Sequence, residues 1–219
     1  MLREESKSKV GYLKYLGILL LLGGISVLIF TYMPVISAYI EYYFSPKKIE
    51  EIKVEISTKE EITTEIKKDT KVVFVDQEFG LYIPKIGGNA KVIRNVNPYD
   101  KEEYTNALIY GVAHAKGTSL PNQEGNVFLF AHSAVNFYER RKYNVYFYLL
   151  NELEKNDEIY VSYQGEIYNY SVLEVKIVDP SEVKYLGKYL PEDTLTLMTC
   201  WPAGANIKRT VVTAVRDTE

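Results

Sequence analysis

Charged residues are absent from one long stretch near the N-terminus, the 26 residues from Tyr15 to Ile40. Its densest apolar part, Leu16 to Met33, would span roughly 27 Å as a helix, close to the roughly 30 Å of a bilayer core. A core helix of a soluble domain rarely has this length and composition. The pattern predicts a transmembrane helix, and Pro34 is expected to kink or end it.

Two interpretations of this segment compete. Four basic residues precede it and resemble the n-region of a cleaved signal peptide: Arg3, Lys7, Lys9 and Lys14. The apolar run is longer than the about 7 to 15 residues of a signal h-region, so we expect an uncleaved anchor. The same residues place the N-terminus in the cytoplasm by the positive-inside rule, although two lysines soon after the span reduce the asymmetry.

The chain is expected to divide into four parts. These are a cytoplasmic tail (residues 1–14), a transmembrane signal anchor (15–40), a charged stalk (41–71) and a folded domain (72–219). The stalk is rich in Lys, Glu, Thr and Ile and contains no glycine, which is typical of a solvated spacer. The folded domain would then lie outside the cell.

Short β-type runs separated by turn residues fill the remainder of the chain. Many short strands with scarcely any helix favour an all-β sandwich or barrel. Phe137 to Leu153 is the exception, because its aromatic and leucine spacing fits a short helix or helical turn. The predicted strands are Val72–Val75, Leu81–Ile83, Lys91–Ile93, Ala107–Val112, Val127–Ala131, Glu158–Tyr163, Ile167–Ile177, Thr194–Thr199 and Thr210–Val215.

Composition narrows the range of functions. With 47% hydrophobic and 25% charged residues, the chain has the composition of a folded protein. Its net charge of -3 offers no broad basic surface, so we expect no nucleic-acid partner. The chain has one cysteine, which excludes an intramolecular disulfide, and its two histidines make a structural zinc site unexpected.

No cofactor is expected from the sequence. Calcium needs several oxygen ligands that converge on one point. The acidic residues available for it, Glu102, Glu103, Asp157 and Glu158, are scattered along the chain. Calcium therefore stays an option that the sequence does not support, and no metal-binding residues are predicted.

The single cysteine lies at the predicted end of a strand. Pro202 cannot donate to a β-ladder, so pairing should stop soon after Cys200. A second strand begins near Arg209, and if the two strands are adjacent the thiol and the guanidinium share one rim of the sheet. A guanidinium there would favour the thiolate over the thiol.

A histidine is the expected partner of a nucleophilic cysteine. His132 ends the apolar run Phe128 to Ala131, and His114 lies where another strand gives way to a loop. Position alone leaves both histidines possible.

The residues around Cys200 resemble the signature of the sortases, the membrane-anchored cysteine transpeptidases of bacterial cell surfaces. Thr196 to Cys200 reads Thr-Leu-Met-Thr-Cys, and Arg209 opens the next strand. Gly111 to His132 is similar to the family's run that ends in the catalytic histidine, and Leu81 to Ile86 is similar to its opening strand. The resemblance extends from about Phe74 to Val215.

This resemblance implies the fold and the site. The fold would be a closed or partly open eight-stranded sortase-like β-barrel with short helices, behind the transmembrane helix and the stalk. The catalytic residues would be His132, Cys200 and Arg209. Thr199, Trp201 and His114 would have supporting or substrate-binding roles, structural in the case of His114.

Several positions depart from the family pattern. Many relatives have glycine before the catalytic histidine and arginine or asparagine after it, whereas Ala131 and Ser133 flank His132 here. A bulky Trp201 follows the cysteine directly. The segment before the domain has no Asp-Pro-aromatic motif, the lid feature of many pilin-polymerising relatives. The subclass therefore stays open.

The resemblance also implies substrates and location. The enzyme would cleave a Leu-Pro-x-Thr-Gly-like sorting signal of a secreted protein and transfer the protein to a cell-surface amine, such as a cell-wall precursor. Two alternatives remain: a cysteine endopeptidase, in which water takes the place of the amine, and a non-enzymatic β-domain tethered to the surface.

Overall fold

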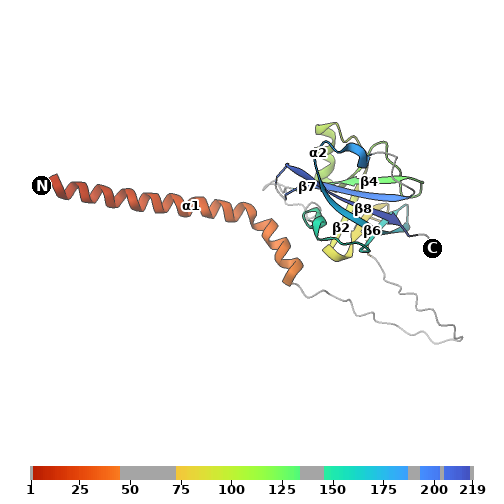
Figure 1. Cartoon of the computed structure of the whole chain (residues 1–219), viewed down its shortest axis with the longest axis horizontal. Coiled ribbons are helices and arrows are strands. Elements are labelled where there is room, and N and C mark those ends of the chain that lie inside the picture. The colour runs from red at the N-terminus through yellow and green to blue at the C-terminus, as the bar shows by residue number, and fades with distance from the viewer. Residues whose placement is uncertain (1, 45–72, 134–145, 187–192, 203–204, 218–219) are drawn as a thin grey trace, which may run out of the picture.

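The computed structural model describes residues 2–44, 73–133, 146–186, 193–202 and 205–217. Figure 1 shows that this part of the chain consists of one long N-terminal helix and a strand-rich unit. Most of the predicted stalk, residues 45–71, lies outside the described residues.

The N-terminal helix α1 extends from Leu2 to Phe44. It contains one segment long and apolar enough to cross a membrane, Lys14–Met33, with 20 residues, a mean hydropathy of 2.3 and none of its surface buried. An end of the helix at Pro34 was one of the two expected outcomes, and it is wrong: the helix continues for ten more residues, to Phe44. Figure 1 shows a bend in the part of α1 near its C-terminal end, and the kink expected at Pro34 stays a prediction.

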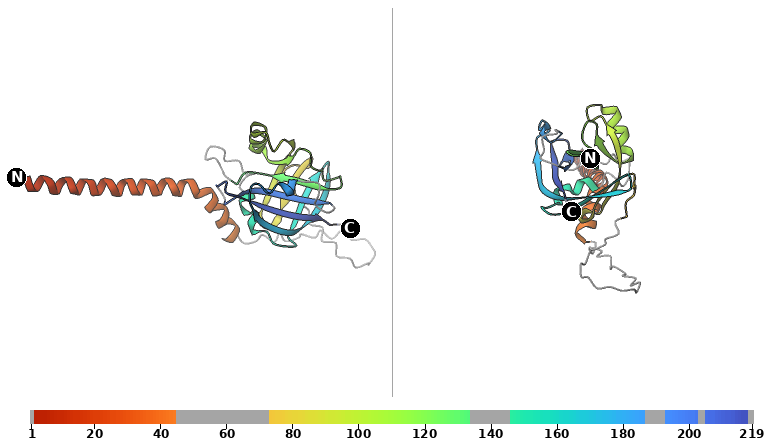
Figure 2. Two further views of the ribbon diagram at one scale, coloured as in Figure 1. Left: turned by 45° about the horizontal axis from the view of Figure 1, so that its top comes forward. Right: turned by 90° about the vertical axis from the view of Figure 1, so that its right-hand side faces the viewer.

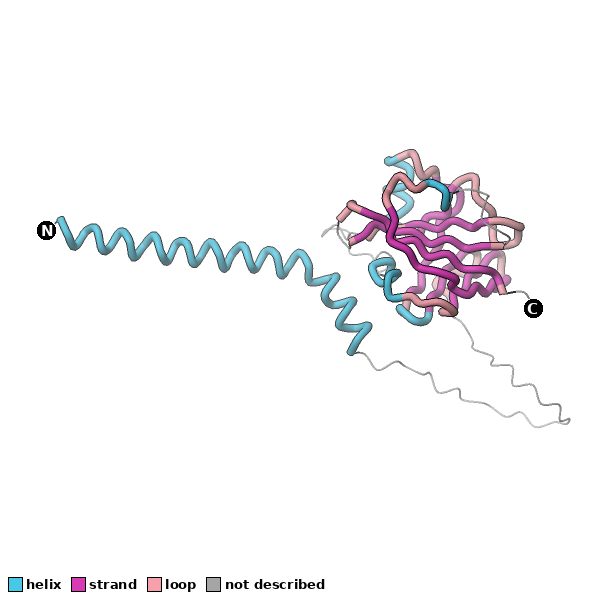
Figure 3. The backbone as a smooth tube through the Cα atoms, viewed as in Figure 1, coloured by secondary structure: helices cyan, strands magenta, loops and turns pink. Residues whose placement is uncertain are grey.

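Eight strands close into a barrel in the order β1-β2-β3-β4-β7-β8-β6-β5 (Figure 2). The prediction of an eight-stranded all-β domain with few short helices is therefore confirmed, and Figure 3 shows how strands dominate this unit. The strands are β1 (Phe79–Ile83), β2 (Gly88–Val96), β3 (Val112–Ala115), β4 (Asn126–Phe130), β5 (Glu158–Tyr163), β6 (Glu166–Val178), β7 (Thr194–Trp201) and β8 (Lys208–Arg216).

Two of the neighbouring strand pairs, β2 with β3 and β4 with β7, are parallel. A parallel pair needs a crossover connection, because the chain must return to the same end of the sheet. Helix α2 (Lys101–Tyr110) supplies this crossover between β2 and β3. Short 3-10 helices complete the unit: η1 (Pro84–Ile86), η2 (Tyr146–Glu152) and η3 (Val183–Leu186).

Helix α2 overturns the predicted strand Ala107–Val112. Asp100 caps the helix, and its carboxylate accepts hydrogen bonds from the backbone N–H groups of Glu102 (3.0 Å) and Glu103 (3.1 Å). A cap of this kind, with acidic residues in the first turn, stabilises a helix start. The short apolar run Ala107 to Tyr110 fits a helix face as well as a strand, and the cap decides between them.

The predicted strand Val72–Val75 is also wrong over its described part. Residues 73–75 precede β1 and belong to no strand. The side chain of Asn89 holds them instead: its Oδ1 accepts from the Val75 N–H (2.9 Å) and its amide donates to the Val73 carbonyl (2.6 Å). Both valines are largely exposed, so their β-type composition reflects no buried strand.

The helical turn predicted within Phe137–Leu153 is confirmed where it is described. Residues 146–152 form η2, while residues 137–145 lie outside the described part. Phe147, Leu149 and Leu150 of η2 are buried in the core. The aromatic and leucine spacing of this run therefore reflects a helical turn with one face packed against the core.

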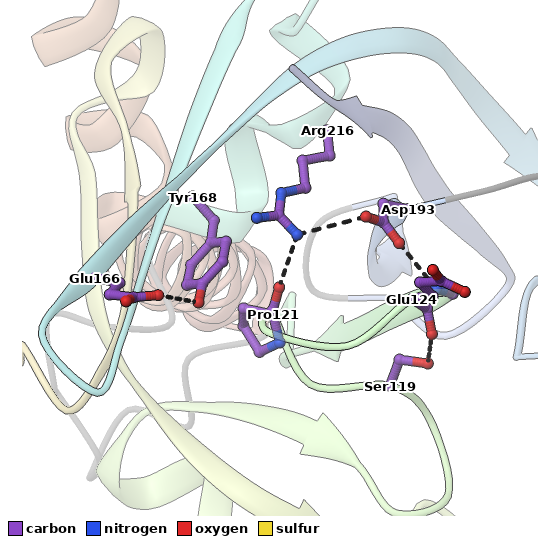
Figure 4. A network of polar contacts seen from close by, with 8 residues as sticks. Ser119, Pro121, Glu124, Glu166, Tyr168, Asp193 and Arg216 are labelled. Carbon is purple, nitrogen blue, oxygen red and sulfur yellow. Dashed lines mark hydrogen bonds and ion pairs between the residues drawn. The ribbon is translucent and has the colours of Figure 1, made fainter. Parts of the chain in front are cut away.

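A polar network joins residues at one end of strands β7 and β8. Arg216 donates to a carboxylate oxygen of Asp193 and to the Pro121 carbonyl, both at 3.4 Å, and its guanidinium lies 4.6 Å from the Tyr168 ring centroid (Figure 4). The Asp193 carboxylate also accepts from the Gly125 N–H (3.1 Å). Because β7 and β8 are antiparallel, this network fixes the end opposite Cys200 and Arg209.

Candidate active site

A cavity of about 450 Å³ lies where β4 and β7 end and β8 begins. Its walls are largely apolar, with a few polar groups among them, which is the usual character of a ligand pocket. The described side chains that line it are Pro98, Tyr99, Tyr104, Leu108, Phe128, Phe130, Ala131, His132, Ser133, Pro180, Met198, Thr199, Cys200, Ala205, Asn206 and Arg209.

Cys200 and Arg209 are direct partners across the β7–β8 ladder. β7 ends at Trp201, so the expectation that Cys200 lies at a strand end next to Arg209 is confirmed in position. Both side chains are partly exposed and both line the cavity. The thiol is therefore reachable from solvent, as a nucleophile must be.

His132 reaches the same cavity from β4. The parallel register of β4 and β7 sets Phe130 opposite Met198, and the Ala131 N–H extends the pairing to the Met198 carbonyl (3.2 Å). The Thr199 hydroxyl donates to the Ala131 carbonyl (3.0 Å). These bonds hold the backbone before His132 against the residues before Cys200, which gives Thr199 a supporting position.

Tyr104 of α2 contacts the His132 ring, with centroids 6.3 Å apart in an edge-to-face arrangement. Sequence reasoning missed Tyr104, because it read the adjoining residues as a strand. The capping pattern that begins at Asp100 was the signal that would have placed a helix here.

Asn206 is a second residue that sequence reasoning missed. It lies between β7 and β8, and its side-chain oxygen accepts from the Cys200 thiol (3.4 Å) and from Arg209 Nη1 (2.6 Å). Arg209 Nη1 also donates to the Lys208 carbonyl (3.0 Å). The sequence does not indicate where the side chain of a loop asparagine points, so only the tertiary structure reveals this contact.

A protein-family model matches almost the whole strand-rich unit and identifies the family of the chain. The family model of the sortase domain matches residues 81–217, which include all of the cavity's lining residues and the barrel except the first two residues of β1. The chain belongs to the sortase family.

Named relatives fall in several sortase classes. Sortase D of Bacillus subtilis strain 168 is 27% identical over 122 residues, 56% of this chain and 53% of that protein, so the match spans about half of that relative. The structure of sortase C-1 from Actinomyces oris is 30% identical, with a TM-score of 0.55 over 66% of this chain and 75% of that one. Clostridium perfringens sortase C, solved with the C-terminal cell wall sorting motif, is 27% identical, with a TM-score of 0.53 over 64% and 70%.

Two other residues singled out in this sortase lie outside the cavity lining. Trp201 is partly buried and pairs with Lys208 at the end of the ladder. His114 is fully buried on β3. Neither side chain is among the described residues that line the cavity.

His114 joins three segments of the barrel. Its Nδ1 accepts from the Asn95 N–H (3.3 Å), so the proton of the neutral ring is on Nε2, which donates to the Ser119 carbonyl (3.0 Å). Burial lowers the pKa of His114 below its ordinary 6.5, and the nearby Arg94 charge acts in the same direction. The geometry fits the structural role expected for this residue.

Lowering the pH should therefore reduce the free energy of unfolding, because His114 is protonated more readily in the unfolded chain than in the folded one. Because its pKa is lower in the folded chain than the ordinary 6.5, the unfolded chain takes up a proton first as the pH falls. The stabilisation is complete above about pH 6.5 and is lost below it, with a slope of up to about 1.4 kcal/mol per pH unit. Urea unfolding of the wild type and of His114→Gln between pH 7.5 and 5.5 measures this pH dependence of stability. The variant should be less stable at pH 7.5 and should show a smaller loss on acidification; equal losses would contradict the assignment.

Ser133 carries a buried hydroxyl next to His132. The residue is 2% exposed, lines the cavity, and its Oγ has no hydrogen-bond partner among the described residues. An unpaired buried polar group costs about 1–3 kcal/mol of stability. Such a hydroxyl in a ligand cavity is available to a bound molecule.

Removing this hydroxyl should stabilise the free protein. Ser133→Ala is expected to raise the free energy of unfolding by about 1 kcal/mol, as measured by urea denaturation. Ser162→Ala is the matched control, because Ser162 is equally buried (2% exposed) but donates to the Asp76 carbonyl at 2.7 Å. The control should lower stability, and a loss of similar size at both positions would refute the expectation.

Three of the four acidic residues considered for calcium have other partners. The Glu103 carboxylate accepts from the Asn97 N–H (2.9 Å). Asp157 forms an ion pair with Lys85 (2.8 Å), and Glu158 accepts from the Tyr160 hydroxyl (2.8 Å). In the described part of this sortase, no three metal-ligating side chains are grouped to hold an ion.

Proposed function

We propose that this sortase is a single-pass membrane cysteine transpeptidase that acts on Leu-Pro-x-Thr-Gly-like sorting signals. The observation that supports it best is that the chain's single cysteine lines one cavity together with His132 and Arg209. A nucleophile, a proton carrier and a cation at one rim suffice for acyl transfer. Membership of the sortase family makes this chemistry the expected one.

The first half-reaction would form a thioacyl enzyme. Cys200 passes its proton to His132 and attacks the carbonyl between the Thr and Gly residues of the sorting signal. A carbon–sulfur bond forms, the carbonyl oxygen becomes negatively charged, and Arg209 stabilises that charge. His132 then protonates the glycine nitrogen as the peptide bond breaks, and the C-terminal tail leaves.

The second half-reaction would transfer the protein. A primary amine attacks the thioester, His132 accepts a proton from the amine, and the new peptide bond forms as Cys200 is released. The apolar walls of the cavity, including Leu108, Phe128 and Met198, suit the leucine and proline side chains of a sorting signal. The structure of Clostridium perfringens sortase C with its sorting motif supports a substrate of this kind.

The helix α1 would anchor the enzyme with its N-terminus in the cytoplasm. The basic residues before Lys14–Met33 support this orientation by the positive-inside rule. The barrel would then face secreted proteins and cell-wall amines on the outer side of the membrane.

Mass spectrometry of the full-length protein in detergent tests the proposal. The protein is mixed with a sorting peptide, with and without a primary amine such as triglycine. We expect a thioacyl adduct on Cys200 and, with the amine, a peptide–amine product. Hydrolysis that none of a panel of amines diverts would reject transfer in favour of an endopeptidase, and no adduct with any sorting peptide would reject both.

A further inference from the structure

The Asn206 side-chain oxygen contacts both the proposed nucleophile and the proposed oxyanion-binding group. It accepts from the Cys200 thiol at 3.4 Å and from Arg209 Nη1 at 2.6 Å. A carbonyl oxygen has two lone pairs, so these two bonds use its full accepting capacity. Asn206 is exposed and does not belong to the buried core of the described residues.

The other groups that face the thiol differ from Asn206 in charge. Arg209 on β8 is cationic, and His132 after β4 is titratable. Helix α2 and the loop before it contribute Tyr104 and Tyr99, and the remaining described lining residues are apolar or carry a hydroxyl. No carboxylate lines the cavity in the described part of the chain. Asn206 is a neutral acceptor, so Arg209 is the one permanently charged side chain among the described residues that line the cavity with Cys200.

We propose that Asn206 is a positioning residue, which holds Cys200 as a hydrogen-bonded thiol and fixes the Arg209 guanidinium beside it in the free enzyme. This inference rests on the proposed function, which makes Cys200 the nucleophile and Arg209 the group that binds the oxyanion. On substrate binding, the thiol exchanges Asn206 for His132 as its acceptor, and the sulfur becomes a thiolate when the proton moves to the imidazole. Arg209, already placed at the sulfur, then meets the carbonyl oxygen that the sulfur attacks.

The charge at position 206 then controls how readily the sulfur ionises. Asn206→Ala removes an acceptor that favours the S–H form, and this favours the thiolate. Asn206→Asp puts a negative charge next to the sulfur and disfavours the thiolate. The two substitutions should therefore act in opposite directions, which a residue that merely orders the loop would not produce.

Alkylation of the full-length protein in detergent measures this directly. The chain has one cysteine, so iodoacetamide labelling reports Cys200 without background from other thiols. The rate is followed from pH 5 to 10 for the wild type and both variants. At pH 7 we expect Asn206→Ala to react about two- to tenfold faster than the wild type, and Asn206→Asp to react about tenfold slower.

Matched controls come from Asn122, an exposed asparagine in the connection between β3 and β4. Asn122→Ala and Asn122→Asp should leave the pH profile of alkylation unchanged. Thermal unfolding of all four variants shows whether each is folded. Profiles that are unchanged at position 206, or that move in the same direction for Ala and Asp, would overturn the inference.

Transfer to an amine supplies a second readout. Asn206→Ala should lower kcat for the sorting peptide although its thiol is more reactive toward iodoacetamide, because Arg209 is no longer fixed at the sulfur. A higher kcat would contradict the positioning role. Alkylation needs no sorting peptide, so a failure of the proposed function appears as an inactive wild type whatever the alkylation profiles are.

Discussion

Replacing Cys200 by alanine should reduce transfer of the sorting peptide on the order of 10⁶-fold, to the rate without enzyme. The expected loss is this large because the chain has no other sulfhydryl to form the thioacyl intermediate. Mass spectrometry of the protein after incubation with peptide, together with product analysis by chromatography, measures both the adduct and turnover.

The fold should survive this substitution. Cys200 is partly exposed at the end of β7, and its thiol donates to the exposed Asn206 side chain. The free energy of unfolding should therefore change by less than about 1 kcal/mol. Asn122→Ala, a change at an exposed position outside the cavity lining, should keep the activity. Product formed by Cys200→Ala at a rate above background would end the proposal that Cys200 is the nucleophile.

Replacing His132 by alanine should reduce transfer by about 10²- to 10⁴-fold, the usual contribution of a general acid–base. The leaving glycine nitrogen needs a proton, and the Cys200 thiol needs an acceptor for its own. A thioester substrate has a leaving group that needs no proton, so the loss should be smaller for it than for the peptide. Initial rates for the two substrates, in the wild type and the variant, measure this difference.

The second histidine supplies the control for this prediction. His114→Gln should lower the free energy of unfolding, because His114 is buried and bonded to Asn95 and Ser119, yet it should leave the ratio of thioester to peptide rates unchanged at a temperature where the variant is folded. If His132→Ala slows both substrates equally, His132 does not protonate the leaving group.

Much of the architecture could be predicted from local patterns. The apolar run within α1 predicts a membrane helix because its length matches a bilayer. Alternation and turn residues locate most strands, and Glu158–Tyr163 was predicted with the bounds that β5 has in the structure. The predicted strand over 107–112 failed because a run this short fits both periods, and the N-terminal cap at Asp100 outweighs the β-type composition.

The site was predictable to a more limited extent. Cys200 and Arg209 are close in sequence, and the expectation that they share one rim depended on their strands being adjacent, which the β7–β8 ladder confirms. In the described part of the chain, η2, β5, β6 and η3 lie between His132 and Cys200, and the residues by themselves did not distinguish His132 from His114. The resemblance to sortases made that choice, and whether His132 is catalytic stays a prediction until the rates are measured.

The sequence by itself determined the long apolar N-terminal helix and the strand-rich domain, because each depends on composition and periodicity along the chain. It placed Cys200 and Arg209 at one rim only on the condition that their strands pair. The tertiary structure alone decided that β4 lies parallel to β7, that α2 brings Tyr104 to His132, and that Asn206 bonds both Cys200 and Arg209. These contacts join segments or orient side chains through closure of the whole barrel. Local propensity carries no information about either, because the free energy that fixes them comes from packing between distant parts of the chain.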